Sequence, residues 1–132
     1  NSLQISEALA SSSSISVIVV GGSVRRGSPT LCGNPGLAFL NELHVDVALL
    51  GTHSISGAIL TETSQDVVAM KRAMIHAARC SIVLADSTKF RQPPALFTIC
   101  GVEDIDKIVT NADASSDALS IIKEAGGAVT TV

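Results

Sequence analysis

The chain has 132 residues, of which 46% are hydrophobic and 2% aromatic, and its formal net charge is −3. This length supports one core but hardly two, the apolar content excludes a disordered chain, and no apolar run reaches the roughly 18 residues of a membrane span. We therefore expect one compact, soluble domain. Its acidity and its lack of Trp and Tyr argue against nucleic-acid binding by this segment itself.

Leu3 to Ala10 has a helical pattern, and Ile15 to Val20 (ISVIVV) is a continuous apolar run typical of a strand buried on both faces. Leu37 to Leu43 predicts a short helix after a Gly-Asn-Pro-Gly breaker. Val45 to Leu50 (VDVALL) predicts a second buried strand. The segment from there to Leu60 is predicted to be an irregular loop.

Ser64 to Arg79 is the longest predicted helix, opened by a serine with polar residues in its first turn. Ser81 to Asp86 predicts a third strand, and Ala95 to Ile99, after a Pro-Pro turn, predicts a shorter edge strand. The remaining predicted elements are a strand over Ile105 to Asn111, a helix over Ser115 to Ala125 and a strand over Ala128 to Val132. This alternation of strands and helices indicates an α/β sheet with covering helices.

Three cysteines, Cys32, Cys80 and Cys100, form no C-x-x-C pair, and their odd number cannot close an intrachain disulfide framework. A reducing cytoplasm is the simple interpretation. The first ten residues lack the basic and apolar regions of a secretory signal. They also lack Met, so we expect a processed or truncated start.

One residue of the longest helix does not fit its apolar pattern. At 100° per residue, Lys71 falls near the centre of the apolar stripe, whereas Arg72 and His76 point away. Its stem could pack along the core while the ammonium reaches solvent at an edge. The ammonium could instead emerge at the strand ends and bind an anion such as phosphate. The residue pattern leaves both alternatives open.

Three loops that follow predicted strands are further candidates for a ligand site. Asp86 ends a buried strand, so Asp86 and Lys89 should lie at the carboxyl edge of the sheet, where α/β proteins bind ligands; a capping aspartate beside a solvated lysine is the simpler alternative. Gly21 and Gly22 would let backbone amides approach an anion. Thr52 and His53 could donate to a hydroxylated ligand or face water.

Several kinds of chemistry find no support in the sequence. The spacing around Gly21 fits neither a dinucleotide-binding fingerprint nor a P-loop. The three histidines lack metal-ligand spacing, so no metal site and no cofactor are expected. There is no G-x-S-x-G elbow, and no catalytic residue can be assigned.

The ordered motifs are more specific together than singly. Taken in order, they resemble the C-terminal effector domain of DeoR-family bacterial transcriptional repressors. The motifs that carry the resemblance are GGSVR (Gly21 to Arg25), the stretch from Gly33 to Gly51, KRAMIHAAR (Lys71 to Arg79) and VLADSTKF (Val83 to Phe90). The resemblance continues through IDKIVTN and EAGGAV and so covers nearly the whole chain.

The resemblance implies a Rossmann-like sheet, similar to the sugar-phosphate isomerase and CoA-transferase fold, that senses a phosphorylated sugar or related metabolite. Such repressors oligomerise and bind DNA through an N-terminal winged helix-turn-helix. That domain and an Asp-x-Gly-Thr-Thr phosphate loop would both precede Asn1, so residues 1–132 would be a partial effector-binding and oligomerisation domain. By position, Asn1, Ser2, Gly21 and Gly22 would border the pocket, Lys71 would supply its interior cation, and Asp86 with Lys89 would close the sugar side.

The chain departs from the family pattern at two places. Val67 stands where relatives carry a glutamate four residues before the helix lysine, and Gly51-Thr52-His53-Ser54 stands where Gly-Ala-Asp-Gly is usual. A lysine without that glutamate would have a freer charge, suited to a more anionic ligand, or the pocket would have decayed. We therefore expect a non-enzymatic sensor of a sugar-metabolism regulator. A sugar-phosphate isomerase or deaminase and a ligand-free oligomerisation module are the alternatives.

Overall fold

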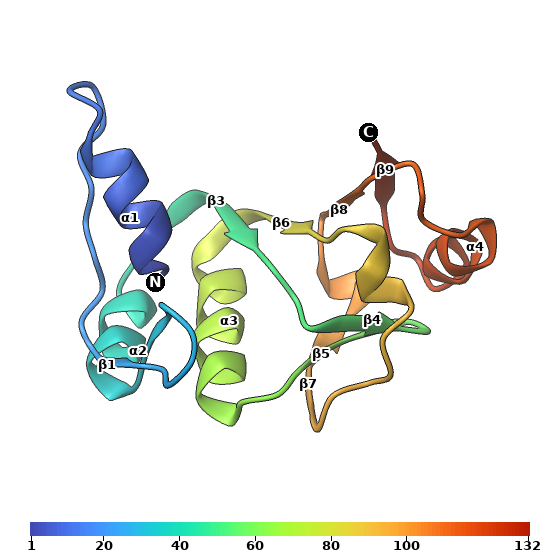
Figure 1. Cartoon of the computed structure of the whole chain (residues 1–132), viewed down its shortest axis with the longest axis horizontal. Helices are drawn as coiled ribbons and strands as arrows, with labels where there is room; N and C mark the ends of the chain where they lie inside the picture. Colours follow the sequence, from blue (N-terminus) through green and yellow to red (C-terminus); the bar gives the residue numbers. More distant parts are fainter.

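The computed structural model describes residues 1–132, which form four α-helices and three β-sheets (Figure 1). In chain order the elements are α1 (Leu3–Ala10), β1 (Ser23–Val24), β2 (Leu31–Cys32), α2 (Asn34–Asn41), β3 (Val45–Leu50), β4 (Ser54–Ser56), β5 (Ile59–Glu62), α3 (Gln65–Ala77), β6 (Ala78–Leu84), the 3-10 helix η1 (Ser87–Phe90), β7 (Phe97–Gly101), the 3-10 helix η2 (Val102–Asp104), β8 (Lys107–Thr110), α4 (Ser116–Glu124) and β9 (Val129–Thr131). Figure 1 shows α1 and α2 at one end of the molecule and α4 with β9 at the other. No helix has the length and apolar character that a membrane crossing requires.

The main sheet is parallel, with strand order β3-β6-β8-β9. Its connections through α3 and α4 step in one direction, so right-handed crossovers place both helices on the same face. One core cluster accordingly contains Val68 of α3 and Ile122 of α4 together with Leu50, Val83 and Ile108 of the strands. This arrangement confirms the predicted α/β class.

A second, antiparallel sheet, β4-β5-β7, packs into the same core through Ile55, Leu60 and Ile99. The prediction of an irregular loop before Leu60 was therefore wrong. The hairpin of β4 and β5 turns at Gly57, whose φ is +59°, a value that glycine adopts without strain. Strands of three and four residues are too short to show a periodicity, which is why the pattern missed them.

The pairing of β5 with β7 contains a bulge, and Arg72 of α3 binds the backbone carbonyls there. Leu60 pairs with Cys100 and Thr61 with Thr98, so Ile99 has no partner residue on β5. Arg72 Nε donates to the Ile99 carbonyl and Arg72 Nη2 to the Thr98 carbonyl, both at 2.8 Å. Arg72 is exposed, as predicted, but its guanidinium ties α3 to β7.

The buried strand predicted over residues 15–20 was wrong. These residues run extended from the turn after α1 without strand pairing, and Ile18 is 76% exposed whereas Val20 is buried. A strand forms only where a neighbouring backbone takes up its N–H and C=O groups. None of the described strands pairs with residues 15–20.

The other elements confirm the predictions with shifted ends. Helix α2 begins at Asn34 rather than Leu37, because Pro35 occupies the first turn, where its missing N–H costs no hydrogen bond. Strand β3 is buried on one face only: Ala48 and Leu50 are buried, whereas Leu49 is 59% exposed. Strand β7 lies at the edge of its sheet, as predicted for residues 95–99, but covers Phe97–Gly101.

Candidate functional site

Lys71 forms a nearly buried ion pair. Lys71 lies at the middle of α3 and reaches toward the end of β5. Its Nζ is 2.5 Å from Glu62 Oε2. The two side chains are 14% and 8% exposed. The expectation of a freer lysine charge was therefore wrong: the missing helix glutamate is replaced by a carboxylate from a neighbouring strand.

The ion pair extends through Thr63 to Arg25. Glu62 Oε1 accepts from the Thr63 amide at 2.8 Å and from the Thr63 hydroxyl at 3.2 Å. The same hydroxyl oxygen accepts from Arg25 Nη2 at 2.8 Å. Arg25 is half-buried, and the other N–H groups of its guanidinium make no hydrogen bond within the protein. The side chains of Arg25, Thr63, Glu62 and Lys71 are thus hydrogen-bonded in series, and we call them the polar chain. It connects the β1–β2 hairpin to α3.

The Glu62 carboxyl is held in its charged form. Burial alone would raise its pKa, but the hydrogen bond from Lys71, the two from Thr63 and the charge of Lys71 outweigh burial, so its pKa lies below the ordinary value of 4.5. A carboxyl whose pKa is lowered by folding stabilises the protein above its unfolded-state pKa, and this contribution disappears as the pH falls through the folded-state pKa.

We therefore expect acid to remove the stabilisation that the ion pair provides. The free energy of unfolding should fall as the pH drops below 4.5, and Glu62→Gln should reduce this dependence. Urea denaturation at a series of pH values measures the free energy of unfolding of the wild type and of the variant. Glu7→Gln, at an exposed glutamate of α1, is the control and should follow the wild type. A Glu62→Gln curve as steep as that of the wild type would contradict the assignment.

Gly22 has no room for a side chain, because a Cβ atom there would lie 2.3 Å from the Cys32 carbonyl oxygen, and its φ is +142°. Gly21 precedes it and faces Pro35. The Cys32 thiol is buried against α3, and its pKa is raised by burial first and then by Asp66, while Arg25 and Lys71 oppose the shift. Cys32 therefore lies against the glycine segment on one side and α3 on the other.

Asn1 and Ser2 have local structural contacts. Asn1 Nδ2 donates to the Leu31 carbonyl at 3.2 Å, and the Leu31 amide donates to the Asn1 carbonyl at 2.8 Å. Ser2 caps α1, its hydroxyl oxygen accepting from the Ile5 amide at 3.3 Å. Both residues line a groove beside β3 with a volume of about 350 Å³, to which Lys71 does not contribute.

Thr52 and His53 follow β3 but belong mainly to the hairpin. The Thr52 hydroxyl is buried and donates to the carbonyls of Ser54 and Thr61, both at 3.1 Å. The His53 amide also donates to the Thr61 carbonyl, and its side chain is half-exposed. Of the two predicted ligand donors, His53 has the more accessible side chain.

Asp86 caps η1. This is the simpler of the two roles that the sequence suggested for it. Its Oδ1 accepts from the Thr88 hydroxyl and from the Thr88 amide, the latter at 2.9 Å, and these bonds keep its pKa below the ordinary value. Asp86 is exposed and lines a shallow hollow of about 280 Å³ with Asn111, whose Oδ1 accepts from the Ser87 amide at 2.7 Å. Lys89 is half-buried in η1 and has no ion-pair partner.

The predicted residues thus fall into separate places. Lys71 lies beside Leu50 and Gly51 at the carboxyl end of β3, while η1, with Asp86 and Lys89, packs against β4. Sequence reasoning missed Glu62 and Thr63 as members of the site. The two-residue turn at Gly57 could have indicated the hairpin that positions Glu62.

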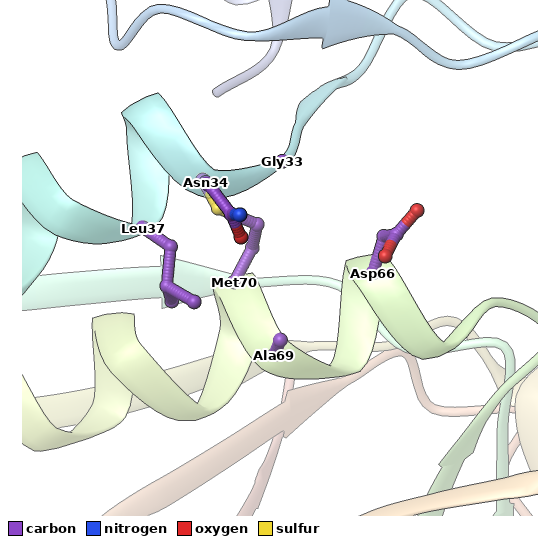
Figure 2. A pocket seen from close by; sticks show the side chains of 6 residues that line it. All are labelled: Gly33, Asn34, Leu37, Asp66, Ala69 and Met70. Atoms are coloured by element: carbon purple, nitrogen blue, oxygen red, sulfur yellow. The ribbon is translucent and has the colours of Figure 1, made fainter.

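A small hollow also opens between the beginnings of α2 and α3 (Figure 2). Figure 2 shows Asn34 and Leu37 of α2 facing Met70 of α3, with Asp66 at the first turn of α3. Its volume is about 40 Å³, which accommodates a water molecule but not a sugar phosphate.

The parallel sheet with α3 and α4 packed on one face defines a Rossmann-like α/β fold. Residues 1–112 match the family model of the DeoR C-terminal sensor domain, and the chain belongs to this family. It is 28% identical to the HTH-type transcriptional repressor GlcR of Bacillus subtilis (strain 168), covering 84% of this chain and 43% of that protein. It is 24% identical to the glycerol-3-phosphate regulon repressor of Escherichia coli (strain K12), covering 94% and 49%.

A third relative, the HTH-type transcriptional regulator GlpR of Haloferax volcanii, is 28% identical over 83% of this chain and 43% of its own length. The chain therefore spans about half the length of the curated relatives it matches. The relatives are transcription regulators, which agrees with the class expected from the motifs.

Proposed function

We propose that this chain is the effector-sensing part of a repressor of sugar metabolism and that a phosphorylated sugar or related metabolite is its ligand. The observation that carries the proposal is the polar chain from Arg25 to Lys71, which ends beside Gly51 at the carboxyl end of β3. Ligands of open α/β sheets bind outside this edge. One relative is named for glycerol 3-phosphate, a small phosphorylated polyol, which supports this ligand class.

The two cations of the polar chain have different parts in the proposed site. Lys71 is neutralised by Glu62, so the pair suits hydroxyl groups of a sugar rather than a bare anion. Arg25 keeps free N–H groups in a planar fork, the geometry that recognises phosphate oxygens. The residues that we place around the ligand are Arg25 and the pair Lys71–Glu62. Of the other predicted residues, Asn1 and Ser2 line the separate groove beside β3, the Thr52 hydroxyl is held by the hairpin, and Asp86 with Lys89 lies in the region of η1 against β4.

The rest of the regulator completes the proposed activity. DNA binding resides in a separate domain of the parent protein, since this chain has a net charge of −3. Ligand binding alters operator affinity through an oligomer, the protein acts in the cytoplasm, and no catalytic step is involved. The absence of turnover distinguishes this proposal from an isomerase or deaminase of the same fold.

Thermal unfolding of the full-length protein in the presence of sugar phosphates tests the proposal. A ligand at about 100 times its Kd adds about 2.7 kcal/mol of stability, so the Tm should rise by several degrees with the cognate compound. Arg25→Met should abolish this rise, whereas Arg26→Met, at the adjacent exposed arginine, should retain it. No rise with any sugar phosphate at millimolar concentration would refute a sensor, and turnover lost in Asp86→Asn would establish an enzyme instead.

A further inference from the structure

The polar chain has its uncompensated charge at one end. It contains two cations, Lys71 and Arg25, and one carboxylate, that of Glu62. Lys71 and Glu62 neutralise each other, whereas Arg25 takes part in neither of the two salt bridges of the structure. The inner end of the polar chain, at Lys71 and Glu62, is therefore neutral, and the outer end, at Arg25, carries one positive charge.

The two ends of the polar chain also differ in access. The side chains of Lys71 and Glu62 are nearly buried, whereas Thr63 is exposed and Arg25 is half-buried. Lys71 also lines a hollow in the core that has no room for a water molecule, so no ligand group can reach it from that side. A ligand therefore meets Arg25 and Thr63 first, and a group that binds the Lys71 ammonium has to displace the Glu62 carboxylate.

Three hydrogen bonds hold the Glu62 carboxylate in its place. Oε2 accepts from Lys71 Nζ, and Oε1 accepts from the amide and the hydroxyl of Thr63. Burial raises the pKa of this carboxyl, but the hydrogen bonds and the charge of Lys71 outweigh burial, so Glu62 is charged at neutral pH. Within the polar chain, a fixed negative charge thus lies between Lys71 and the groups that a ligand meets first.

We propose that Glu62 is a specificity-determining residue that limits the effector to compounds with a single anionic group. This inference rests on the proposed function, in which the phosphate binds Arg25 and the uncharged hydroxyl groups of the ligand meet the neutral pair. A second anionic group directed toward Lys71 would meet the Glu62 carboxylate, and the juxtaposition of like charges opposes binding. Phosphorylated sugars and polyols are therefore accepted, whereas phosphorylated sugar acids are rejected.

Asp66 provides a matched control for the charge of Glu62. After burial, Asp66 and Glu62 both raise the pKa of the Cys32 thiol, so the two carboxylates act on the same region of the protein. Asp66 is exposed, however, and it takes part in no salt bridge. Asp66→Asn therefore removes one negative charge from this region without uncovering Lys71.

Isothermal titration calorimetry of the full-length protein tests the inference with two matched pairs of compounds, in each of which a carboxylate replaces one hydroxymethyl group. The pairs are glycerol 3-phosphate with 3-phosphoglycerate, and glucitol 6-phosphate with 6-phosphogluconate. The wild type should bind at least one polyol phosphate at least about 10-fold more tightly than the corresponding acid. Glu62→Gln should shift this ratio by at least about 10-fold toward the acid, because Lys71 is then free to bind the carboxylate. Asp66→Asn should retain the wild-type ratio.

An unchanged ratio in Glu62→Gln, or an equal shift in Asp66→Asn, would overturn the inference while the proposed function stood, because the polyol phosphate would still bind. Failure of all four compounds to bind the wild type and Glu62→Gln would also overturn it, whereas the wider screen of sugar phosphates decides the proposed function separately.

Two further variants keep the test independent of how well Glu62→Gln folds. Glu62→Asp, whose carboxylate lies on a shorter side chain and holds Lys71 less closely, should shift the ratio in the same direction by a smaller factor. The double variant, Glu62→Leu with Lys71→Met, lacks the cation and should gain no affinity for the acids. The absence of any shift in Glu62→Asp, or a gain in the double variant, would overturn the inference.

Discussion

Glu62→Ala should destabilise the protein by about 3 kcal/mol, since removal of one partner of a buried ion pair leaves the other charge uncompensated. The side chain of Lys71 is 14% exposed, so its ammonium has little access to water that could replace the carboxylate. Urea denaturation monitored by circular dichroism measures the change. Replacement of both residues, Glu62→Leu with Lys71→Met, should recover most of the lost stability, because the charge and its partner leave together.

The exposed pair between Arg79 and Asp46 provides the matched control. Arg79 Nη1 lies 3.4 Å from Asp46 Oδ1, and the side chains of Arg79 and Asp46 are 84% and 89% exposed. Exposed ion pairs are screened by solvent and contribute little, so Asp46→Ala should leave the denaturation midpoint unchanged. Equal effects of Glu62→Ala and Asp46→Ala would show that the Lys71–Glu62 pair is not buried as described.

Gly22→Ala should also cost about 3 kcal/mol, because the added Cβ atom would lie 2.3 Å from the Cys32 carbonyl oxygen, which belongs to the backbone and cannot rotate away. The β1–β2 hairpin would have to move, and Arg25 with it. Thermal unfolding of the variant measures the loss, and loss of the hydrogen bond between Arg25 and Thr63 would weaken effector binding as well.

Gly27→Ala is the matched control, because it tests a positive φ without a steric contact. The φ of Gly27 is +76°, but a Cβ atom there would meet no atom within 4 Å. Gly27→Ala should therefore cost only the conformational penalty of about 1 kcal/mol. If the two alanine variants were equally stable, the close approach of Gly22 to Cys32 would not be a determinant of the fold.

The parallel sheet and its helices follow from local patterns. The alternation of apolar runs with amphipathic stretches is visible within windows of 6 to 16 residues, so the existence of α3, β6 and β8 was predicted correctly. The prediction of a strand over residues 15–20 was wrong for a different reason. Its sequence is suited to a sheet, but strand formation requires a neighbouring backbone that the described chain does not provide.

The candidate site was harder to predict because its contacts are not local. Lys71 was correctly placed facing the sheet, but its partner lies nine positions earlier on a strand that was not predicted. Helical periodicity identifies partners three or four residues away and cannot find this one. Arg25 and Thr63 meet across 38 positions of sequence, which only the folded chain brings together.

The adjacent residues Lys71 and Arg72 count equally in the net charge, yet they are not chemically equivalent in this fold. Lys71 offers one compact cation to one carboxylate, whereas the two nitrogens of Arg72 span consecutive carbonyls at the bulge of β7. An ammonium cannot bridge both carbonyls with the same geometry, and a planar guanidinium would meet the Glu62 carboxylate with a different set of donors than the ammonium does. An exchange of the two residues would therefore leave composition and formal charge unchanged while it disrupted both attachments of α3 to the small sheet.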